Sequence, residues 1–268
     1  MNNSAVLFFV ALTAALLAPT QTSTHVRSVE FVAHRGASFD APENTVAAAK
    51  TAWSQNADAV ETDIRLTKDG EVIVSHDANT RRTTGRNALI SDLTLAEARS
   101  LDAGRQMGAD FAGEKLPTLD ELIETIPAGK RLFVEIKTGP EILPALEKTL
   151  ARTRASEKNI VLISFDLEVL RQAHQKWPQY TTLWLVGYDG SRSVAQLIET
   201  ARQAGLSGLD LSSSWPLDIA SVKQIKAAQL QLHVWTIDDL AVAKRWIKLG
   251  ADGVTTNQAG WMREQLAT

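Results

Sequence analysis

Short apolar runs alternate with longer amphipathic stretches from about residue 29 to the end of the chain. Runs of about four to eight apolar, β-branched or aromatic residues are typical of buried strands, and eight are present, at 29–33, 58–64, 131–136, 159–164, 181–186, 207–211, 230–237 and 251–256. Stretches with helical spacing of apolar residues lie at 44–55, 144–155, 167–177, 193–205, 219–229 and 238–250. This alternation predicts an α/β fold, a closed parallel barrel of the TIM (β/α)8 type. A doubly wound open sheet is the alternative, but no glycine-rich nucleotide-binding loop follows the first strand.

Local end signals support several of the predicted helices. Asn44 and Thr45 precede the first helical stretch and are interpreted as its capping residues. Asp238 and Asp239 precede the last long helical stretch, where N-cap residues belong. Gly250 follows that stretch, as glycines at helix C-termini do.

The segment 78–117 breaks the alternation of strands and helices. It is rich in Arg, Gly and Asp and separates the second predicted barrel strand from the third. Structureless loops longer than about 15 residues are uncommon in compact domains unless they are functional. We therefore expect an inserted cap over the barrel mouth, with a short helix at 93–101.

Two acidic residues interrupt the second predicted strand, AVETDI. Because residues i and i+2 of a strand point to the same face, Glu61 and Asp63 share one face and their apolar neighbours share the other. Unpaired carboxylates on a dry face would cost several kcal/mol each, so water, a cation or a basic partner must meet them. Glu135 and Lys137 form a similar i, i+2 pair at the end of the third strand.

Further polar residues stand at the C-terminal ends of the predicted strands, which form the functional face of a parallel barrel. The first strand ends in His34 and Arg35, His76 follows a hairpin turn after the second, and Trp235 stands near the end of the seventh. Each feature alone has an ordinary interpretation, such as a solvated strand face, a structural histidine or barrel packing. The inner face of a barrel strand is not solvated, however, so their convergence predicts a functional site.

The order of these motifs resembles that of the glycerophosphodiester phosphodiesterase family. The matching segments are HRGASFDAPENTVAAAKTAW, AVETDIRLTKDGEVIVSHD, LDAG, GEKLPTLDE, LFVEIK, VWTIDD and GADGVTTN. They extend over essentially the whole chain after the N-terminal apolar run. The resemblance implies a TIM barrel, one divalent cation, Ca²⁺ or Mg²⁺, and hydrolysis of a small-molecule glycerophosphodiester to an alcohol and glycerol 3-phosphate.

The resemblance also implies which residues carry the chemistry. Glu61, Asp63 and Glu135 would hold the cation, because carboxylate oxygens are ligands that Ca²⁺ and Mg²⁺ prefer. His34 and His76 would move protons, since histidine titrates nearest neutral pH. The nucleophile implied is the adjacent glycerol hydroxyl, which closes a cyclic phosphate that water then opens.

The remaining site residues would contact the substrate or orient other side chains. Arg35 and Lys137 would bind phosphate oxygens, Arg35 through its planar fork and Lys137 as a point charge. Trp235 would form an apolar wall against the glycerol carbons, with barrel packing as the alternative. Asp77 is expected to orient the neighbouring histidine or to bind a ligand directly, and Glu43 to orient Arg35 or to lie behind the metal ligands.

Composition excludes several classes of function. The chain has 268 residues, a net charge of -3 and no cysteine. Because no basic block and no stripe of basic and aromatic residues is present, nucleic acid is not an expected partner. The lack of cysteine excludes disulfides, thiol catalysis and cysteine metal sites.

The N-terminus carries an apolar run, AVLFFVALTAALLA at 5–18, after which the chain turns polar. The run is short for a bilayer span and fits the core of a signal peptide, although no Lys or Arg precedes it. We predict a secretory signal peptide at 1–24 and a single phosphodiesterase-like barrel domain at 25–268. The protein would then be exported, to the periplasm or the medium, with no membrane span after signal removal. An uncleaved anchor or an N-terminal helix packed on the domain is the alternative.

Two other functions are compatible with the same motifs. One is a phospholipase D-type activity on lysophospholipids or sphingolipids, which would need an apolar platform at the barrel mouth. The charged insert favours small, deacylated substrates instead. The other is a non-catalytic, anion-binding barrel, which the loss of a histidine or a metal ligand would support, and none is lost.

Overall fold

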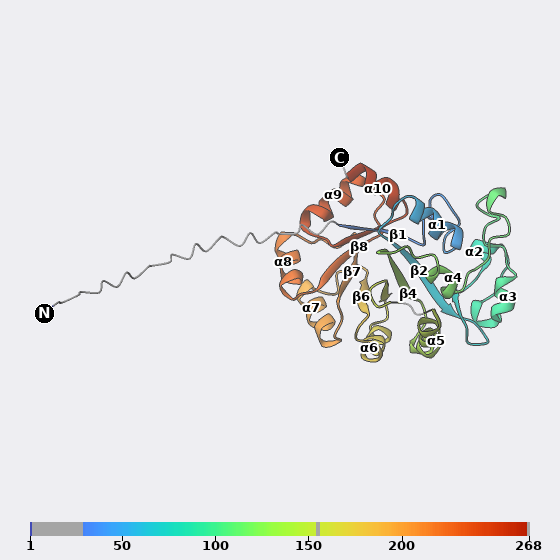
Figure 1. The fold of residues 1–268 in the computed structure, drawn as a ribbon, viewed down its shortest axis with the longest axis horizontal. Coiled ribbons are helices and arrows are strands. Elements are labelled where there is room, and N and C mark those ends of the chain that lie inside the picture. Colours follow the sequence, from blue (N-terminus) through green and yellow to red (C-terminus); the bar gives the residue numbers. More distant parts are fainter. Residues whose placement is uncertain (2–28, 154–155, 267–268) are drawn as a thin grey trace.

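The computed structural model describes Met1 and residues 29–153 and 156–266. In this part of the chain nine strands form one sheet in the order β1-β9-β8-β7-β6-β5-β4-β2-β3, which a pairing of β1 with β2 closes. All neighbours except β2 and β3 are parallel. The eight parallel strands form a barrel with helices around it (Figure 1). The predicted TIM (β/α)8 barrel is therefore confirmed.

The bounds of the elements follow. The strands are β1 (Glu30–Ala33), β2 (Ala59–Leu66), β3 (Val72–Val74), β4 (Arg131–Ile136), β5 (Ile160–Ser164), β6 (Thr181–Val186), β7 (Gly208–Ser212), β8 (Gln231–Trp235) and β9 (Gly253–Thr256). The α-helices are α1 (Val46–Ser54), α2 (Arg81–Thr84), α3 (Leu95–Arg99), α4 (Leu119–Ile123), α5 (Leu143–Thr153), α6 (Leu167–Lys176), α7 (Val194–Gln203), α8 (Ile219–Ala227), α9 (Leu240–Leu249) and α10 (Ala259–Leu266). The short 3-10 helices are η1 (Ile90–Asp92), η2 (Ala109–Phe111) and η3 (Pro140–Ile142).

The alternation of side chains along β2 separates two apolar layers. Ala59 packs inside the barrel with Phe133 of β4, whereas Val60 and Ile64 belong to the layer between the sheet and the outer helices. Glu61 and Asp63 have the same parity as Ala59, so they share its inner face. The pattern in the sequence therefore placed both acids correctly.

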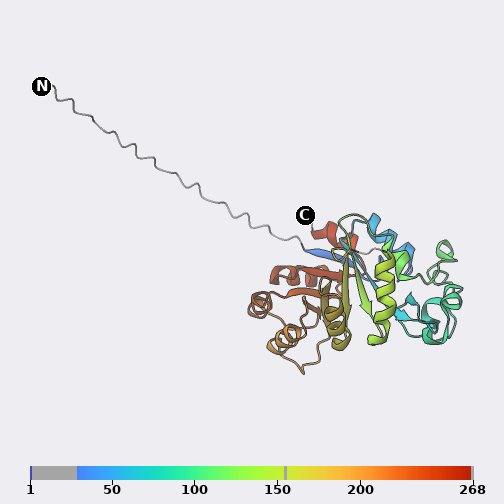
Figure 2. The ribbon, with the colours of Figure 1, turned by 60° about the horizontal axis from the view of Figure 1, so that its bottom comes forward.

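The insert lies between β3 and α4 and contains α2, η1, α3 and η2. It lies on one side of the barrel in both views, coloured cyan to green (Figures 1 and 2). Its own small core includes Ile90, Leu93 and Leu101, packed on Ile73 of β3. This burial explains why so long a segment between two strands is ordered.

Two of the predicted N-caps and the predicted C-terminal glycine are present. The Thr45 side chain accepts a hydrogen bond from the Ala48 amide at the start of α1. Asp239 accepts bonds from two amides at the start of α9. Gly250 ends that helix in the left-handed conformation, with φ 104°, which glycine adopts without steric cost.

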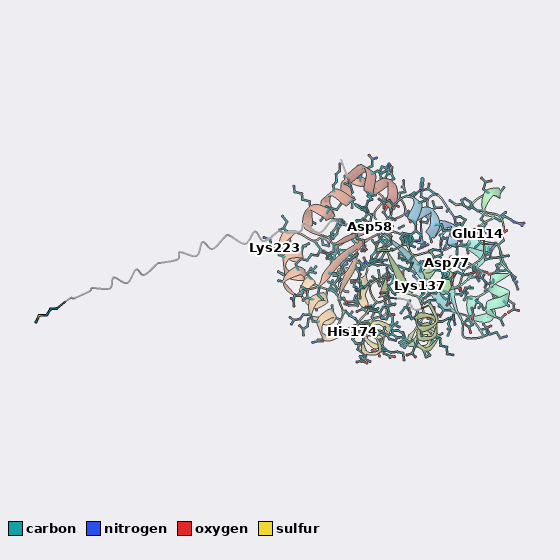
Figure 3. The ribbon with its side chains drawn as sticks, viewed as in Figure 1. Asp58, Asp77, Glu114, Lys137, His174 and Lys223 are labelled. Carbon is teal, nitrogen blue, oxygen red and sulfur yellow. The ribbon has the colours of Figure 1, made fainter. Side chains whose placement is uncertain are left out.

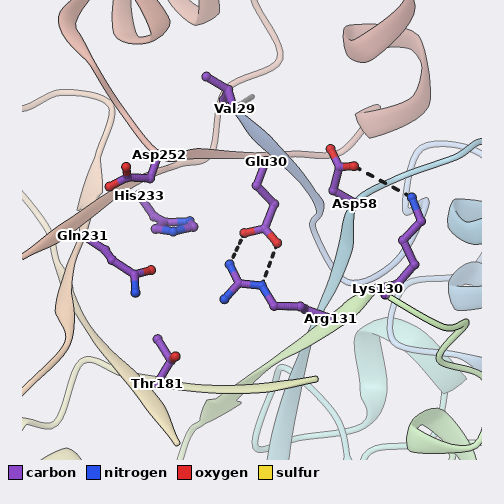
Figure 4. Close-up of a pocket in the computed structure, with 10 residues that line it drawn as sticks. Val29, Glu30, Asp58, Lys130, Arg131, Thr181, Gln231, His233 and Asp252 are labelled. Carbon is purple, nitrogen blue, oxygen red and sulfur yellow. Dashed lines mark hydrogen bonds and ion pairs between the residues drawn. The ribbon is translucent and has the colours of Figure 1, made fainter. Parts of the chain in front are cut away.

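The N-terminal ends of the strands surround a cavity of about 530 Å³ (Figure 4). Its charges are paired with one another: the Arg131 guanidinium binds Glu30, and Lys130 lies 3.8 Å from Asp58. His233 also lines this cavity and packs on Phe133. These charges already have partners, and they lie at the opposite end of the barrel from the acidic pair on β2. The rim that holds the acidic pair is therefore the candidate site.

The predicted signal peptide at 1–24 lies outside the described residues. Among residues 29–153 and 156–266, no helix has the length and apolar character needed to cross a bilayer.

Candidate active site

Three buried carboxylates meet at the C-terminal rim of the barrel. In the register of β2 and β4, Asp63 stands directly opposite Glu135, and Glu61 lies two residues earlier on the same face. One oxygen atom from each of the three lies within 4.8 Å of the others. Among the residues that the structure describes, no other group of three acids, histidines or cysteines is so placed.

Basic groups meet these carboxylates only in part. The Lys137 Nζ lies 2.7 Å from Glu135 Oε1 and 3.6 Å from Asp63 Oδ1. The Arg35 amide donates a 2.8 Å hydrogen bond to Glu61 Oε2. Glu61 Oε1 and Asp63 Oδ1 are buried and accept no hydrogen bond. Buried polar atoms are rarely left in this state, so the cluster has acceptors to spare for a ligand.

The electrostatics of the cluster also favour binding of a cation. Burial, and then the charges of Asp63 and Glu135, raise the pKa of Glu61 well above its ordinary value. Burial and the charge of Asp63 raise the pKa of Glu135 to about 7. A divalent cation favours the ionised form of such groups. Three carboxylates offer the hard oxygen donors that suit Mg²⁺ or Ca²⁺, so the residues fit such an ion.

The raised pKa of Glu135 predicts that the metal-free protein loses stability as pH rises. The folded state holds this proton more tightly than the unfolded chain, whose pKa is near 4.5. The contribution is therefore present below pH 4.5 and is lost as pH rises through about 7. We expect the melting temperature to fall by roughly 5–10 °C between pH 5 and pH 8, which corresponds to about 3 kcal/mol. Calorimetry of wild type and Glu135→Gln checks this, and an equal fall in both would contradict it.

Asn44 positions Asp63, which corrects its interpretation as a capping residue. Its Nδ2 donates a 2.7 Å hydrogen bond to Asp63 Oδ2, and its Oδ1 accepts bonds from the Thr62 hydroxyl and the Asp63 amide. Asn44 has φ 59°, a left-handed conformation that asparagine tolerates. This conformation explains why Asn44 does not cap the helix. Thr45 is the cap of α1, and the side-chain amide of Asn44 bonds to β2.

Replacing Asn44 by glycine is expected to weaken metal binding about 10–100-fold, because groups that hold a metal ligand in place contribute that much. Glycine keeps the positive φ and removes only the amide. Asn56→Gly is the matched control, since Asn56 is exposed and has φ 61°. Titration calorimetry with Mg²⁺ or Ca²⁺ measures both. Equal affinities in the two variants would contradict this role.

The segment His34-Arg35-Gly36 folds tightly against α1. A Cβ on Gly36 would lie 2.7 Å from the backbone of Ala48, so only glycine fits there. Arg35 itself has φ 56°, which costs a non-glycine residue about 1–2 kcal/mol. Its Nη1 lies 3.1 Å from Glu43 Oε1, whereas its buried Nε has no hydrogen-bond partner. Arg35 is thus held at the site with a donor left for a ligand.

Asn257 fixes the tautomer of His34. The Asn257 amide nitrogen donates to Asp238, so its Oδ1 faces His34 Nδ1 at 2.8 Å as an acceptor. Nδ1 therefore carries the proton, and Nε2, 4.0 Å from Glu61 Oε2, holds the lone pair. Burial, and then the charge of Arg35, lower the pKa of His34. Asp238 does not cap α9, contrary to the prediction. Its carboxylate instead accepts hydrogen bonds from Asn257 and Thr256.

Asp77 orients the second histidine. His76 Nδ1 lies 2.7 Å from Asp77 Oδ1, so Nε2 is the ring nitrogen that remains for another partner. Arg82 binds both Asp77 and Glu43 and so ties the insert to the rim. Burial opposes ionisation of Asp77, but hydrogen bonds from Arg82 and His76 outweigh it and lower its pKa to about 2. Asp77 is consequently a carboxylate throughout the neutral range.

A cavity of about 150 Å³ connects these groups. Seven of the eight residues singled out in the sequence line it: His34, Arg35, Glu61, His76, Glu135, Lys137 and Trp235. The eighth, Asp63, lies behind it in contact with Lys137 and Arg35. The structure thus brings all eight to one place.

Two other side chains at the site were not predicted from the sequence. Phe165 follows β5 and packs edge-on against Trp235, with ring centroids 5.4 Å apart, to form an apolar wall. Asp210 on β7 lies at the cavity, fully buried, and burial raises its pKa well above the ordinary value. The inward parity of Asp210 on its strand is the one feature that could have indicated it.

Comparison with known proteins identifies the family. Residues 34–260 match the glycerophosphoryl diester phosphodiesterase family. The chain belongs to this family. It is an enzyme of the phosphoric diester hydrolase class, as the residues of the barrel rim had indicated.

Relatives in the glycerophosphoryl diester phosphodiesterase family cover most of the chain. A glycerophosphodiester phosphodiesterase from Caldanaerobacter subterraneus is 34% identical over 236 residues, which is 84% of this chain and 93% of the relative. One from Bacillus subtilis is 32% identical over 245 residues, 84% of this chain and 82% of the relative. A phosphodiesterase from Oleispira antarctica, solved in complex with the product sn-glycerol-3-phosphate, superposes with a TM-score of 0.83 at 30% identity, covering 89% of this chain and 97% of that one.

Proposed function

We propose that this enzyme hydrolyses glycerophosphodiesters to an alcohol and glycerol 3-phosphate, with a divalent cation held by Glu61, Asp63 and Glu135. The observation that carries the proposal is the buried carboxylate cluster, whose oxygens lie within 4.8 Å of one another in a cavity that His34 and His76 also line. The bound product of the Oleispira antarctica phosphodiesterase supports the choice of substrate.

Charge balance at the cluster favours binding of a phosphodiester. When all three carboxylates are ionised, they outweigh Arg35 and Lys137 by one negative charge, which would repel the substrate. With a dication bound, the same groups carry one net positive charge, and the cation supplies Lewis-acid polarisation of a phosphoryl oxygen. Arg35 Nε and Lys137 Nζ then bind the other phosphate oxygens through charge-assisted hydrogen bonds. The apolar wall of Phe165 and Trp235 contacts the glycerol carbons.

Two histidines move the protons of the first step. His34 Nε2, the lone-pair nitrogen, accepts the proton of the glycerol hydroxyl next to the phosphate, and that oxygen attacks phosphorus. The bond from phosphorus to the head-group oxygen breaks, and His76 Nε2 donates a proton to the leaving alcohol. The assignment follows from the low pKa and fixed tautomer of His34, and from the position of His76 at the open side of the cavity.

Water completes the reaction in the reverse sense. His76, now lacking its Nε2 proton, accepts one from a water molecule that attacks the cyclic phosphate. The bond from phosphorus to the glycerol hydroxyl oxygen breaks, and His34 returns its proton to that oxygen. The products are the free alcohol and glycerol 3-phosphate, and both histidines regain their starting states.

Hydrolysis of glycerophosphocholine, measured with and without a chelator, tests the proposal. We expect release of glycerol 3-phosphate that a chelator abolishes and that added Mg²⁺ or Ca²⁺ restores. Lysophosphatidylcholine serves as the parallel substrate, because release of choline from this lipid alone would instead support phospholipase D-type activity. Binding of inorganic phosphate without turnover of either substrate would support a non-catalytic barrel.

We also propose that residues 1–24 direct export, so that the enzyme acts in the periplasm or the medium. The apolar run at 5–18 supports this. Sequencing of the N-terminus of the mature protein tests it, since a chain that begins at Met1 would contradict it.

A further inference from the structure

A second cavity of about 950 Å³ lies where the insert meets the barrel rim. Asp77 and Lys137, which both line it, are marked in Figure 3. His76 and Lys137 line this cavity as well as the smaller one of about 150 Å³. A phosphate bound at Lys137 is therefore in a position to direct one of its two substituents into each cavity.

The sizes of the two cavities indicate which substituent enters which. The smaller cavity, about 150 Å³, has the apolar wall of Phe165 and Trp235 and suits the three-carbon glycerol arm. The larger cavity has room for the leaving alcohol. Because His76 stands between them, its proton reaches the oxygen of that alcohol, as the proposed reaction requires.

The larger cavity is strongly basic. Arg65, Arg81, Arg82 and Lys137 line it, against one acid, Asp77. Arg82 and Lys137 already have carboxylate partners.

Two of these arginines remain without a carboxylate partner. Arg65 donates through Nε and Nη2 to the backbone carbonyl of His76, which fixes its guanidinium and leaves other donors free. In the described part of the chain, no carboxylate lies within ion-pair distance of Arg65 or Arg81. Arg81 is exposed and its guanidinium makes no hydrogen bond there. The cavity therefore holds two cationic groups that have no carboxylate within ion-pair distance.

We propose that this cavity binds an anionic group, a carboxylate or a phosphate, carried by the leaving alcohol. The inference rests on the proposed phosphodiesterase activity and adds its head-group preference. Planar guanidinium groups bind carboxylates and phosphates through paired hydrogen bonds. A cationic head group would meet like charges in the same place.

Three substrates of one length test the preference: glycerol 3-phosphate esterified to glycolate, to ethylene glycol and to ethanolamine. They carry an anionic, a neutral and a cationic head group on two-carbon alcohols. We expect kcat/KM to be about 10-fold higher for glycolate than for ethylene glycol, the factor of one hydrogen bond to a charged group, and lowest for ethanolamine. Equal values, or a preference for ethanolamine, would overturn the inference. Absence of turnover of all three would overturn the phosphodiesterase activity itself.

Substitution of Arg81 tests whether this cavity sets the head-group preference. Arg81→Gln removes the positive charge, and Arg81→Glu reverses it. We expect the ratio of kcat/KM for glycolate to that for ethylene glycol to fall about 10-fold in Arg81→Gln and further in Arg81→Glu. Arg86→Glu is the control, because Arg86 is exposed in the same insert and does not line the cavity. An equal fall in Arg86→Glu would show that the net charge of the insert, and not this cavity, sets the preference.

Discussion

Alanine at position 34 is expected to lower kcat/KM for glycerophosphocholine by about 10²–10⁴-fold, the range typical of a lost general base. The effect should hold for every substrate, because the glycerol hydroxyl must lose its proton whatever the leaving group. The neighbours of His34 are Asn257, Arg35 and Glu61, and each of them has other partners. The fold of the variant should therefore persist. Circular dichroism of the variant checks the fold.

Alanine at position 76 is expected to act differently. It should lower kcat/KM for glycerophosphocholine as strongly, but much less for glycerol 3-phosphate esterified to p-nitrophenol. A p-nitrophenolate leaves without a proton, so a missing general acid matters little there.

His174→Ala is the matched control for both histidine substitutions. His174 lies on α6, at the periphery of the barrel, and lines neither cavity at the rim (Figure 3). Its activity should equal that of wild type. If the His76 variant, like the His34 variant, lost as much activity on the p-nitrophenyl ester as on glycerophosphocholine, the assignment of base and acid would be contradicted. Unchanged activity in both variants would dismiss the two-histidine mechanism.

The second large effect is expected at the carboxylates. Glu61→Gln removes one charge but keeps the shape of the side chain, whose Oε1 has no hydrogen bond in the protein. If that oxygen binds the cation, kcat/KM should fall by at least about 10³-fold, since a bound cation contributes several kcal/mol to the transition state. A higher metal concentration should be needed for the activity that remains.

Glu199→Gln controls for the loss of a negative charge, because Glu199 is exposed on α7, away from the rim. Its activity and its metal requirement should match those of wild type. A Glu61→Gln enzyme with the metal requirement of wild type would exclude this carboxylate from the metal site.

The barrel could be predicted because its strands are buried on both faces. Parallel strands covered by helices are apolar along their whole length, and the runs at 131–136 and 181–186 coincide with β4 and β6. The short strand β3 has only three residues and pairs antiparallel with β2, outside the barrel. Its length made it indistinguishable from part of a turn in the sequence.

The acids could be predicted because period-two alternation fixes which face a side chain takes. That signal is local, and it places Glu61 and Asp63 together without any knowledge of their partners. The supports of His34 lie beyond its reach: Asn257 is 223 positions away along the chain. Only the pairing of β1 with β9, from opposite ends of the chain, brings them together.

Asn44 shows a different limit of the sequence pattern. Its position just before α1 is typical of a capping residue, and propensity alone cannot indicate a positive φ. The hydrogen bonds to Asp63 and Thr62 determine its conformation instead. Tertiary contacts thus decided the role of a residue whose local setting indicated another.

A crystal structure of the enzyme grown with Mn²⁺, with anomalous data collected at the manganese edge, tests whether the three carboxylates bind one divalent cation. Mn²⁺ prefers the same oxygen ligands as Mg²⁺. We expect one anomalous peak within about 2.0–2.6 Å of an oxygen atom from each of Glu61, Asp63 and Glu135. No peak at the three carboxylates, in an enzyme that is active in the same Mn²⁺ solution, would contradict it.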